Sequence, residues 1–428
     1  MENLSSKPWS QSKKILFRLV FAYIFLYCFA FPIYFIPYGS ILIHPIGTQL
    51  QNLSIWLGHH LFGIVDEIPT AETGSGDTLI YWLLWATKTI LALMVTVVWS
   101  VLDRERASYE FLQRVLITYT RYFVALIIFS YGMAKVIPTQ FSEPSYTQLM
   151  KTYGESSPMN LLWTLMGYST PYQVFGGIME VLAAVLLLFR RTVLLGALVM
   201  MTVMANVVAM NFAFDVPVKL ASSHYLLFSM GLAWIFKRNL IDLFFLQNPS
   251  QPIVLKPMFQ EKRAFIATQI FKTVFLGYFF YTAVSNNLNY QKSIREGAMV
   301  SPLAGVYNVQ SIPIANDSLV NAKTPMPIKR LIFDNYRPER LTLAFEDDSK
   351  IRYLAEYDEE KQLIKAVLPS DSTNRMELTY KFDEEGRLYL KGVYKEDSLF
   401  LEINRIEIDS LLLVKKKFQW ISPVPFNR

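Results

Sequence analysis

The sequence predicts an α-helical bundle that crosses a membrane about seven times, followed by an all-β domain outside the membrane. Of the 428 residues, 52% are hydrophobic and only 18% are charged, which is more apolar than an ordinary soluble protein of this length. The long apolar runs lie almost entirely before residue 285, whereas the later part alternates apolar and polar residues. We therefore expect a transmembrane helical domain at 1–284, a linker at 285–304 and an antiparallel β domain at 305–428.

Seven apolar runs are long enough, or nearly so, to cross a hydrocarbon layer of about 30 Å. They are 15–36, 79–101, 116–137, 172–188, 192–214, 222–235 and 265–284. The sixth run is short and needs a flanking residue at each end, or a tilted neighbour, to cross.

Lysine and arginine residues set the expected orientation of these spans. They cluster before the first span, and then between the second and third, the fourth and fifth, and the sixth and seventh. The alternate loops are poor in positive charge, and 38–77 contains neither residue type. The N-terminus is therefore expected in the cytoplasm. The β domain is expected outside the plasma (inner) membrane, in the periplasm.

Two of the external loops repeat apolar residues at helical spacing, at 46–62 and at 160–168. Helices of this kind lie in the membrane interface, or they fold back as a lid over the bundle. Both arrangements stay open.

The C-terminal part carries the period-2 pattern of half-buried strands. In 375–382 (RMELTYKF), for example, Met376 and Leu378 face one side, and Glu377 faces the other. The remaining strands are expected at 305–313, 328–333, 340–345, 351–357, 362–367, 387–394, 398–406 and 411–420.

Eight or nine strands joined by tight hairpins indicate a small up-and-down barrel, because closure removes exposed strand edges. The barrel resembles lipocalins in strand number and length, as an architecture only. Its interior either is filled by its own side chains or holds one small apolar ligand.

Glu180 lies midway along an otherwise largely apolar run, 171–188, that ends before Arg190 and Arg191. At ~1.5 Å per helical residue, it lies close to the centre of a hydrocarbon layer of ~30 Å. A carboxylate there costs about 2.5–3.5 kcal/mol, so an acid at this depth indicates a functional site. Glu180 therefore serves a ligand or a proton, or it holds a proton without any further role.

Six more polar residues are candidates for ligand binding or proton relay with Glu180: Lys88, Tyr131, Lys135, Asn206, Asn211 and His224. Tyr131 and Lys135 share a helix face, because they are four residues apart. Lys88 falls at a depth similar to that of Glu180 and is a candidate ion-pair partner. We expect a cavity open to the outside, lined by Lys135, Glu180, Asn206, Asn211 and His224. The alternative is that these groups only tie helices together, or that Lys135 reaches the outer interface.

Other chemistries are not indicated. The single cysteine, Cys28, provides no disulfide, no CxxC pair and no thiolate zinc site. The adjacent His59 and His60 point apart on a helix, so no metal site is expected. The net charge of +6 comes mostly from residues at span ends, and no nucleic-acid partner is expected. No nucleotide-binding or hydrolase motif is present.

The core of the chain, 121–235, resembles the DoxX-like family of small four-helix membrane proteins. The segments that carry the resemblance are RYFVALIIFSYGMAKVIP (121–138), YQVFGGIMEVLAAVLLLFRR (172–191) and LLGALVMMTVMANVVAMNF (194–212). The matching positions are Gly132, Lys135, Gly177, Glu180 and Arg190. The resemblance implies a DoxX-like core at about 115–237 and makes a quinone or lipid-like ligand conceivable. It covers little more than a quarter of the chain, which adds two spans before the core, one after it and an external domain.

Three functions follow as hypotheses. In the preferred one, this is an accessory or ligand-binding envelope protein whose bundle holds a quinone or lipid, and whose β domain contacts a partner protein or a ligand. The second is a membrane subunit of a quinone-linked oxidoreductase whose cofactor sits on a partner. The third is a proton-coupled small-molecule transporter that uses Glu180, for which inverted repeats or paired broken spans would be expected. No catalytic residue is predicted.

Overall fold

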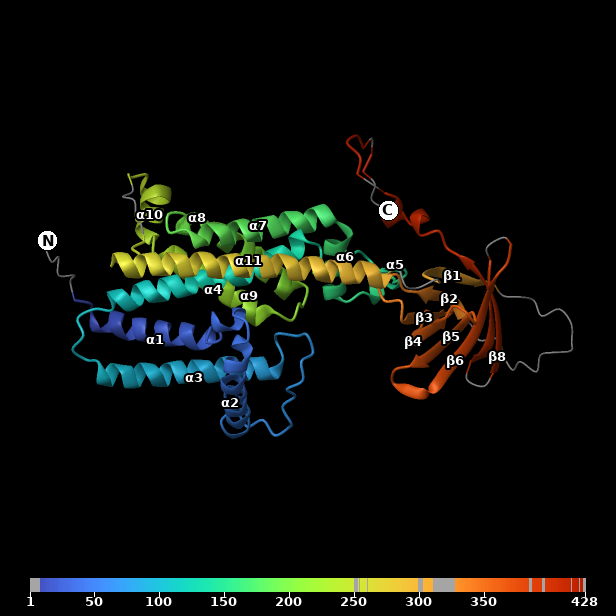
Figure 1. Ribbon diagram of the computed structural model, residues 1–428, viewed down its shortest axis with the longest axis horizontal. Helices are drawn as coiled ribbons and strands as arrows, with labels where there is room; N and C mark the ends of the chain where they lie inside the picture. The colour runs from blue at the N-terminus through green and yellow to red at the C-terminus, as the bar shows by residue number, and fades with distance from the viewer. Residues whose placement is uncertain are drawn as a thin grey trace, which may run out of the picture. The chain divides into compact units, whose positions relative to one another are not determined.

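Figure 1 shows the computed structural model, which describes residues 8–249, 253, 255–259, 261–298, 303–310, 328–384, 387–394, 397–416, 418–422 and 424–425. The chain forms two compact units. The first, here called the helical unit, comprises Met1–Phe141 and Ser157–Asn287. The second, the barrel unit, comprises Ser142–Ser156 and Leu288–Arg428. The chain therefore passes between the units three times, whereas the sequence analysis anticipated one passage through a linker.

Helices make up the helical unit. The longer ones are α1 (Gln11–Tyr27), α2 (Gly39–His60), α3 (Leu79–Leu102), α4 (Glu110–Val136), α6 (Pro158–Tyr168), α7 (Thr170–Leu188), α8 (Val193–Ala213), α9 (Lys219–Trp234) and α11 (Lys262–Ala298), of which residues 262–287 belong to this unit. Shorter helical segments are η1 (Ile33–Phe35), α10 (Lys237–Ile241) and η3 (Asp242–Leu246). Among the described residues, five helices are long and apolar enough to cross a membrane: α3, α4, α7, α8 and α11.

The first predicted span is longer than the helix that forms. α1 ends at Tyr27 rather than near residue 36, and the chain then turns through the Phe31–Pro32 peptide into η1. A helix does not continue through Pro32, because proline lacks an N–H donor and disfavours helical backbone at the preceding residue. α1 therefore has 17 residues, and α9, the sixth predicted span, has 16.

α2 replaces the first predicted interfacial helix and starts earlier, at Gly39 rather than at residue 46. It runs across the direction of α1 and α3 in Figure 1. The second such helix, predicted at 160–168, is α6, and the side chain of Ser157 caps its N-terminus by accepting a hydrogen bond from the Asn160 amide. Part of the predicted linker is also helical, because α11 continues to Ala298 without a proline.

α4 is the central helix of the helical unit. Its side chains Phe123, Val124, Leu126 and Ile128 are buried in one continuous core with residues of α1, α7, α8 and α9. α4 packs along α7, α7 pairs with α8, and α8 pairs with α9. This order places residues of α4 and α7 in direct contact.

The barrel unit contains a closed barrel of eight antiparallel strands, each paired with its neighbours in sequence order, with β1 also pairing with β8. The strands are β1 (Gly305–Gln310), β2 (Ile328–Phe333), β3 (Arg340–Phe345), β4 (Lys350–Asp358), β5 (Leu363–Leu368), β6 (Asp371–Phe382), β7 (Leu388–Tyr394) and β8 (Asp397–Arg405). The all-β architecture and its closure are confirmed. Residues 311–313 of the first predicted strand lie outside the described residues.

The ninth predicted strand, 411–420, is wrong. The chain there forms a 3-10 turn, η4 (Ile408–Ser410), and one helical turn, α12 (Leu412–Lys415). This segment has consecutive apolar residues followed by consecutive lysines, so it lacks the period-2 alternation of a strand. The pairing of β1 with β8 also leaves no barrel edge for it to join.

The interior of the barrel is a packed core. Leu331, Tyr353, Ile364, Leu378 and Ile403 are each fully buried, one from each of five strands. They belong to one continuous apolar cluster that includes residues of all eight strands. Of the two alternatives for the interior, the filled barrel agrees with this burial.

Residues 142–156 form a strap on the barrel, with the short helices α5 (Tyr146–Leu149) and η2 (Tyr153–Glu155). At one end, Thr147 donates to the Asp334 carboxylate over 2.8 Å, and the Tyr146 amide donates to Asn335 over 3.0 Å. At the other end, Lys350 of β4 donates to Glu155 over 2.6 Å. Polar contacts therefore fasten the strap at both ends.

Replacing Glu155 with glutamine is expected to loosen the second end of the strap at neutral pH. The hydrogen bond from Lys350, together with those from Thr152, lowers the pKa of Glu155 to about 2. Because this pKa lies below the ordinary glutamate value of about 4.3, the contact stabilises the strap fully above that pH and is lost as the pH falls towards 2. Amide hydrogen exchange of 142–156 should be faster in Glu155→Gln at pH 7, and the difference should shrink below about pH 4.

The exposed Glu346 offers a control, because it forms no ion pair in the described part of the barrel unit. Glu346→Gln should leave exchange in the strap unchanged. Equal exchange rates in Glu155→Gln and the unaltered protein at pH 7 would contradict the fastening role of this contact.

Candidate functional site

Two glycines let α4 and α7 approach each other closely. A Cβ atom at Gly177 would lie 2.7 Å from the carbonyl oxygen of Gly132, and one at Gly132 would lie 3.0 Å from the carbonyl oxygen of Gly177. Only residues without a side chain fit such a backbone contact. The α4–α7 crossing therefore depends on these two positions.

An ion pair lies one helical turn from the glycines. Lys135 follows Gly132 by three residues, and Glu180 follows Gly177 by three. The Lys135 Nζ donates to both carboxylate oxygens of Glu180, over 2.9 Å to Oε1 and 2.8 Å to Oε2. Their side chains are only 11% and 5% exposed. The predicted proximity of Lys135 and Glu180 is thus a direct, buried contact between two apolar helices.

Tyr131 marks the exposed side of this pair. Its ring centroid lies 5.9 Å from the Lys135 Nζ, and the residue is 44% exposed. Tyr131 therefore lies at the surface of the helical unit beside a buried charge. The shared face with Lys135, expected from the four-residue spacing, agrees with this contact.

His224 belongs to a second polar cluster, formed by α1, α3 and α9. Its Nδ1 lies 2.7 Å from the carbonyl oxygen of Leu220, which only accepts, so Nδ1 carries the proton. In the neutral ring Nε2 is then an acceptor, and the Tyr23 hydroxyl donates to it over 2.5 Å. The Trp85 indole N–H donates to the same hydroxyl over 3.0 Å. Neither Lys135 nor Glu180 is among the hydrogen-bond partners of His224 in the described part of the chain.

Lys88 does not pair with Glu180, so that prediction is wrong. Its Nζ lies 3.4 Å from the carbonyl oxygen of Tyr27, and 5.6 Å and 5.4 Å from the ring centroids of Tyr27 and Phe29. Similar depth along two helices does not bring two residues together when they face different neighbours. The ring of Tyr27 also stacks on His224 at 4.2 Å, which joins Lys88 to the second cluster.

The two asparagines of α8 have different environments. Asn211 is buried and donates to the Ser222 hydroxyl over 3.0 Å, which ties α8 to α9. Asn206 is exposed on the outer face of α8. Asn206 therefore does not line an interior cavity with Lys135 and Glu180. Of the five residues predicted to line such a cavity, the structure brings only Lys135 and Glu180 into mutual contact.

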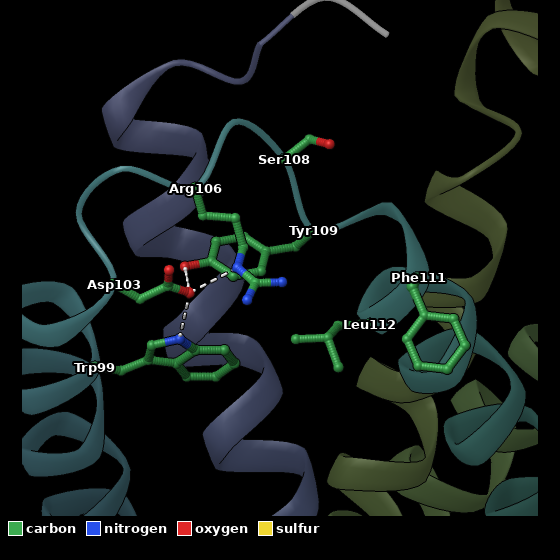
Figure 2. Close-up of a pocket in the computed structure, with 7 residues that line it drawn as sticks. All are labelled: Trp99, Asp103, Arg106, Ser108, Tyr109, Phe111 and Leu112. Atoms are coloured by element: carbon green, nitrogen blue, oxygen red, sulfur yellow. Dashed lines mark hydrogen bonds and ion pairs between the residues drawn. The ribbon is translucent and has the colours of Figure 1, made fainter. Parts of the chain in front are cut away.

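One polar network was missed by the sequence reasoning. Figure 2 shows it at the end of α3, beside a cavity of about 280 Å³ lined by Trp99, Asp103, Arg106, Ser108, Tyr109, Phe111 and Leu112. One carboxylate oxygen of Asp103 accepts from Tyr109 over 2.9 Å and from Trp99 over 3.3 Å, and it pairs with Arg106 at 2.9 Å. Burial raises the pKa of Asp103, but the hydrogen bonds from Tyr109 and Trp99 and the positive charge of Arg106 together outweigh it, so this pKa lies below its ordinary value.

Arg18 anchors the network from α1. It is 1% exposed and donates to the Tyr109 hydroxyl over 2.8 Å, to Ser100 over 3.0 Å and to the Asp103 carbonyl oxygen over 2.6 Å. Every described partner of Arg18 is therefore a neutral oxygen. The sequence did offer a sign of this network, because Arg18 lies inside the first apolar run. A basic residue near the end of a span is also expected from the positive-inside rule, so Arg18 did not stand out.

Over 124 residues, the chain is 37% identical to the uncharacterised protein YwoB of Bacillus subtilis (strain 168). The match includes 29% of this chain and 79% of YwoB. The chain belongs to the YwoB family. No protein-family profile and no solved structure matches it. The name of YwoB states no activity. The roles of the Lys135–Glu180 pair and of the two other polar clusters therefore have to be inferred from their geometry.

Proposed function

We propose that this chain is an integral membrane protein whose helical unit is embedded in the bilayer. The five long apolar helices support this placement, since each has the length and composition of a span. α2 supports it as well, because it runs across α3 and leaves Ile41, Leu42 and Trp56 exposed. A helix lying flat in the interface would bury these side chains among lipid headgroups.

In the proposed orientation, the N-terminus is cytoplasmic and the barrel lies outside the plasma membrane, in the periplasm. The basic connections support it: Arg104 and Arg106 lie between α3 and α4, and Arg190 and Arg191 lie between α7 and α8. A reporter that is active only outside the membrane should give signal when fused after Arg428. A silent reporter would contradict this orientation.

We further propose that the Lys135–Glu180 pair binds a quinone or a lipid-like ligand. The buried pair is the observation that carries this proposal. Removing two ions from water costs free energy, so ionisable residues inside a membrane usually mark a functional site. Lys135 has three N–H donors, and two of them reach Glu180. The third is available to a carbonyl or ester oxygen. Tyr131, exposed beside the ammonium group, offers an aromatic surface to an amphipathic ligand that arrives from the lipid.

The DoxX-like resemblance adds support. Four of its positions, Gly132, Lys135, Gly177 and Glu180, lie together at one helix crossing. A family pattern whose residues form one local structure is better explained by a shared site than by chance similarity of apolar helices. The single cysteine provides no dithiol for electron transfer. We therefore propose an accessory, ligand-binding role, with the barrel facing an envelope partner.

Native mass spectrometry of the purified protein in mild detergent tests the ligand proposal. The unaltered protein should retain an added mass that matches a quinone or a lipid, identified after extraction. The double variant Lys135→Met/Glu180→Gln should lose it while remaining folded, since it contains no unpaired buried charge.

The exposed pair of Lys292 and Glu296 provides the matched control, because its side chains are 73% and 65% exposed. Lys292→Met/Glu296→Gln should retain the ligand in full. A protein that repeatedly carries no ligand, or a Lys135→Met/Glu180→Gln variant that retains it, would overturn the proposal.

A further inference from the structure

Three basic residues gather where the α7–α8 turn meets α4 and α11. Arg121 of α4 is 4% exposed, and its Nε is buried without a hydrogen-bond partner. Lys272 of α11 lies 5.5 Å from the ring centroid of Tyr122, and the guanidinium of Arg121 lies 5.0 Å from the same ring. Arg190, in the turn, is close enough that its charge repels that of Arg121. These three residues are here called the basic cluster.

The described partners of the basic cluster are neutral. Lys272 donates to the carbonyl oxygen of Leu188 over 3.0 Å, and Arg190 donates to that of Leu255 over 3.4 Å. Within the described residues, no carboxylate lies within 4.0 Å of any of the three. Three like charges thus lie together in a partly buried region, where their mutual repulsion is weakly screened.

We infer that the basic cluster binds a phosphate-bearing anion between α4, α11 and the α7–α8 turn. Two guanidinium groups offer forked N–H donors that match phosphate oxygens, and Lys272 adds a compact positive charge. The anion would neutralise the repulsion and give the Arg121 Nε a hydrogen-bond partner. The oxygens of one phosphate group can accept hydrogen bonds from several N–H donors at once, whereas a single carboxylate oxygen cannot.

The source of the phosphate is either a lipid headgroup or free inorganic phosphate. The inference rests on the proposed membrane placement but not on a ligand at Lys135–Glu180. In the proposed orientation, the α7–α8 turn lies at the cytoplasmic end of its helices. Basic sites between helices on that side bind the headgroups of anionic lipids.

Titration of the full chain in mild detergent tests the inference, with the thermal midpoint and native mass spectrometry as readouts. Phosphatidylglycerol should raise the midpoint more than phosphatidylcholine does. Arg190→Gln and Lys272→Gln should each weaken phosphatidylglycerol binding roughly fivefold, the effect of about one basic residue near a membrane surface. These two positions are only partly buried, so they are preferred to Arg121, whose replacement risks misfolding.

The neighbouring Arg191 is exposed and serves as the control, so Arg191→Gln should bind phosphatidylglycerol as the unaltered protein does. Inorganic phosphate that raises the midpoint and displaces the lipid would support the site and identify free phosphate as its occupant. Equal binding of the two lipids without any effect of phosphate would overturn the inference, as would unchanged binding in both cluster variants. A quinone at Lys135–Glu180 has its own mass in the same spectra, so failure of one site is distinguishable from failure of the other.

Discussion

Replacing Glu180 with glutamine is expected to destabilise the helical unit by about 3–5 kcal/mol, the usual effect of removing one partner of a buried ion pair. Glutamine keeps the shape of the side chain, but it leaves the Lys135 ammonium buried without a counter-charge. In the unaltered protein, the Lys135 Nζ lies 2.8–2.9 Å from the two carboxylate oxygens of Glu180, and both side chains are nearly inaccessible to water. Chemical unfolding in mild detergent measures the change.

An exposed ion pair shows what the same chemistry is worth in water. Lys292 and Glu296 lie 3.6 Å apart on the surface of α11, and such pairs contribute about 0–1 kcal/mol. Glu296→Gln should therefore change the free energy of unfolding by no more than this. A loss in Glu180→Gln as small as that in Glu296→Gln would show that the Lys135–Glu180 pair is not effectively buried.

Replacing Gly177 with alanine is expected to cost about 1–3 kcal/mol, the usual effect of overpacking a close contact. The added Cβ would lie 2.7 Å from the Gly132 carbonyl oxygen and 2.8 Å from the Lys135 Cβ. The first of these atoms belongs to a helix backbone, so relief requires α4 and α7 to separate. The separation would also lengthen the Lys135–Glu180 contact, and ligand retention should fall together with stability.

Gly176 is the matched control, because it precedes Gly177 in the same helix and a Cβ there would meet no atom within 4 Å. Gly176→Ala should leave stability unchanged or raise it by up to about 1 kcal/mol, since alanine is the better helix former. Thermal midpoints in detergent compare the two variants directly. Equal midpoints for Gly176→Ala and Gly177→Ala would contradict the close crossing of α4 and α7.

The sequence predicted the local structure well, because local patterns determine it. Apolar runs placed the helices, and period-2 alternation placed the eight strands to within a few residues. Lys135 and Glu180 were predicted to lie near each other because each is exceptional for its apolar surroundings, but their ion pair was not predicted. The supposed pairing of Lys88 with Glu180 failed because depth along a helix says nothing about which neighbour a side chain faces.

Contacts between distant parts of the chain had no local signal. The strap joins Thr147 to Asp334 and Glu155 to Lys350, residues separated by 187 and 195 positions. Neither end of the strap has a sequence pattern from which its partner in the barrel could be predicted. Arg18 and Arg121 were passed over for a different reason, since a basic residue near the end of an apolar run also fits the positive-inside rule.

Lys135 and Glu180 act as one buried unit at the α4–α7 crossing, and a double-mutant cycle measures the coupling between them. The free energy of unfolding is measured for Lys135→Met, Glu180→Gln, the double variant and the unaltered protein. We predict a coupling energy of about 2–3 kcal/mol, with the double variant losing much less stability than the sum of the two single losses. Additive losses, with a coupling energy near zero, would contradict the claim.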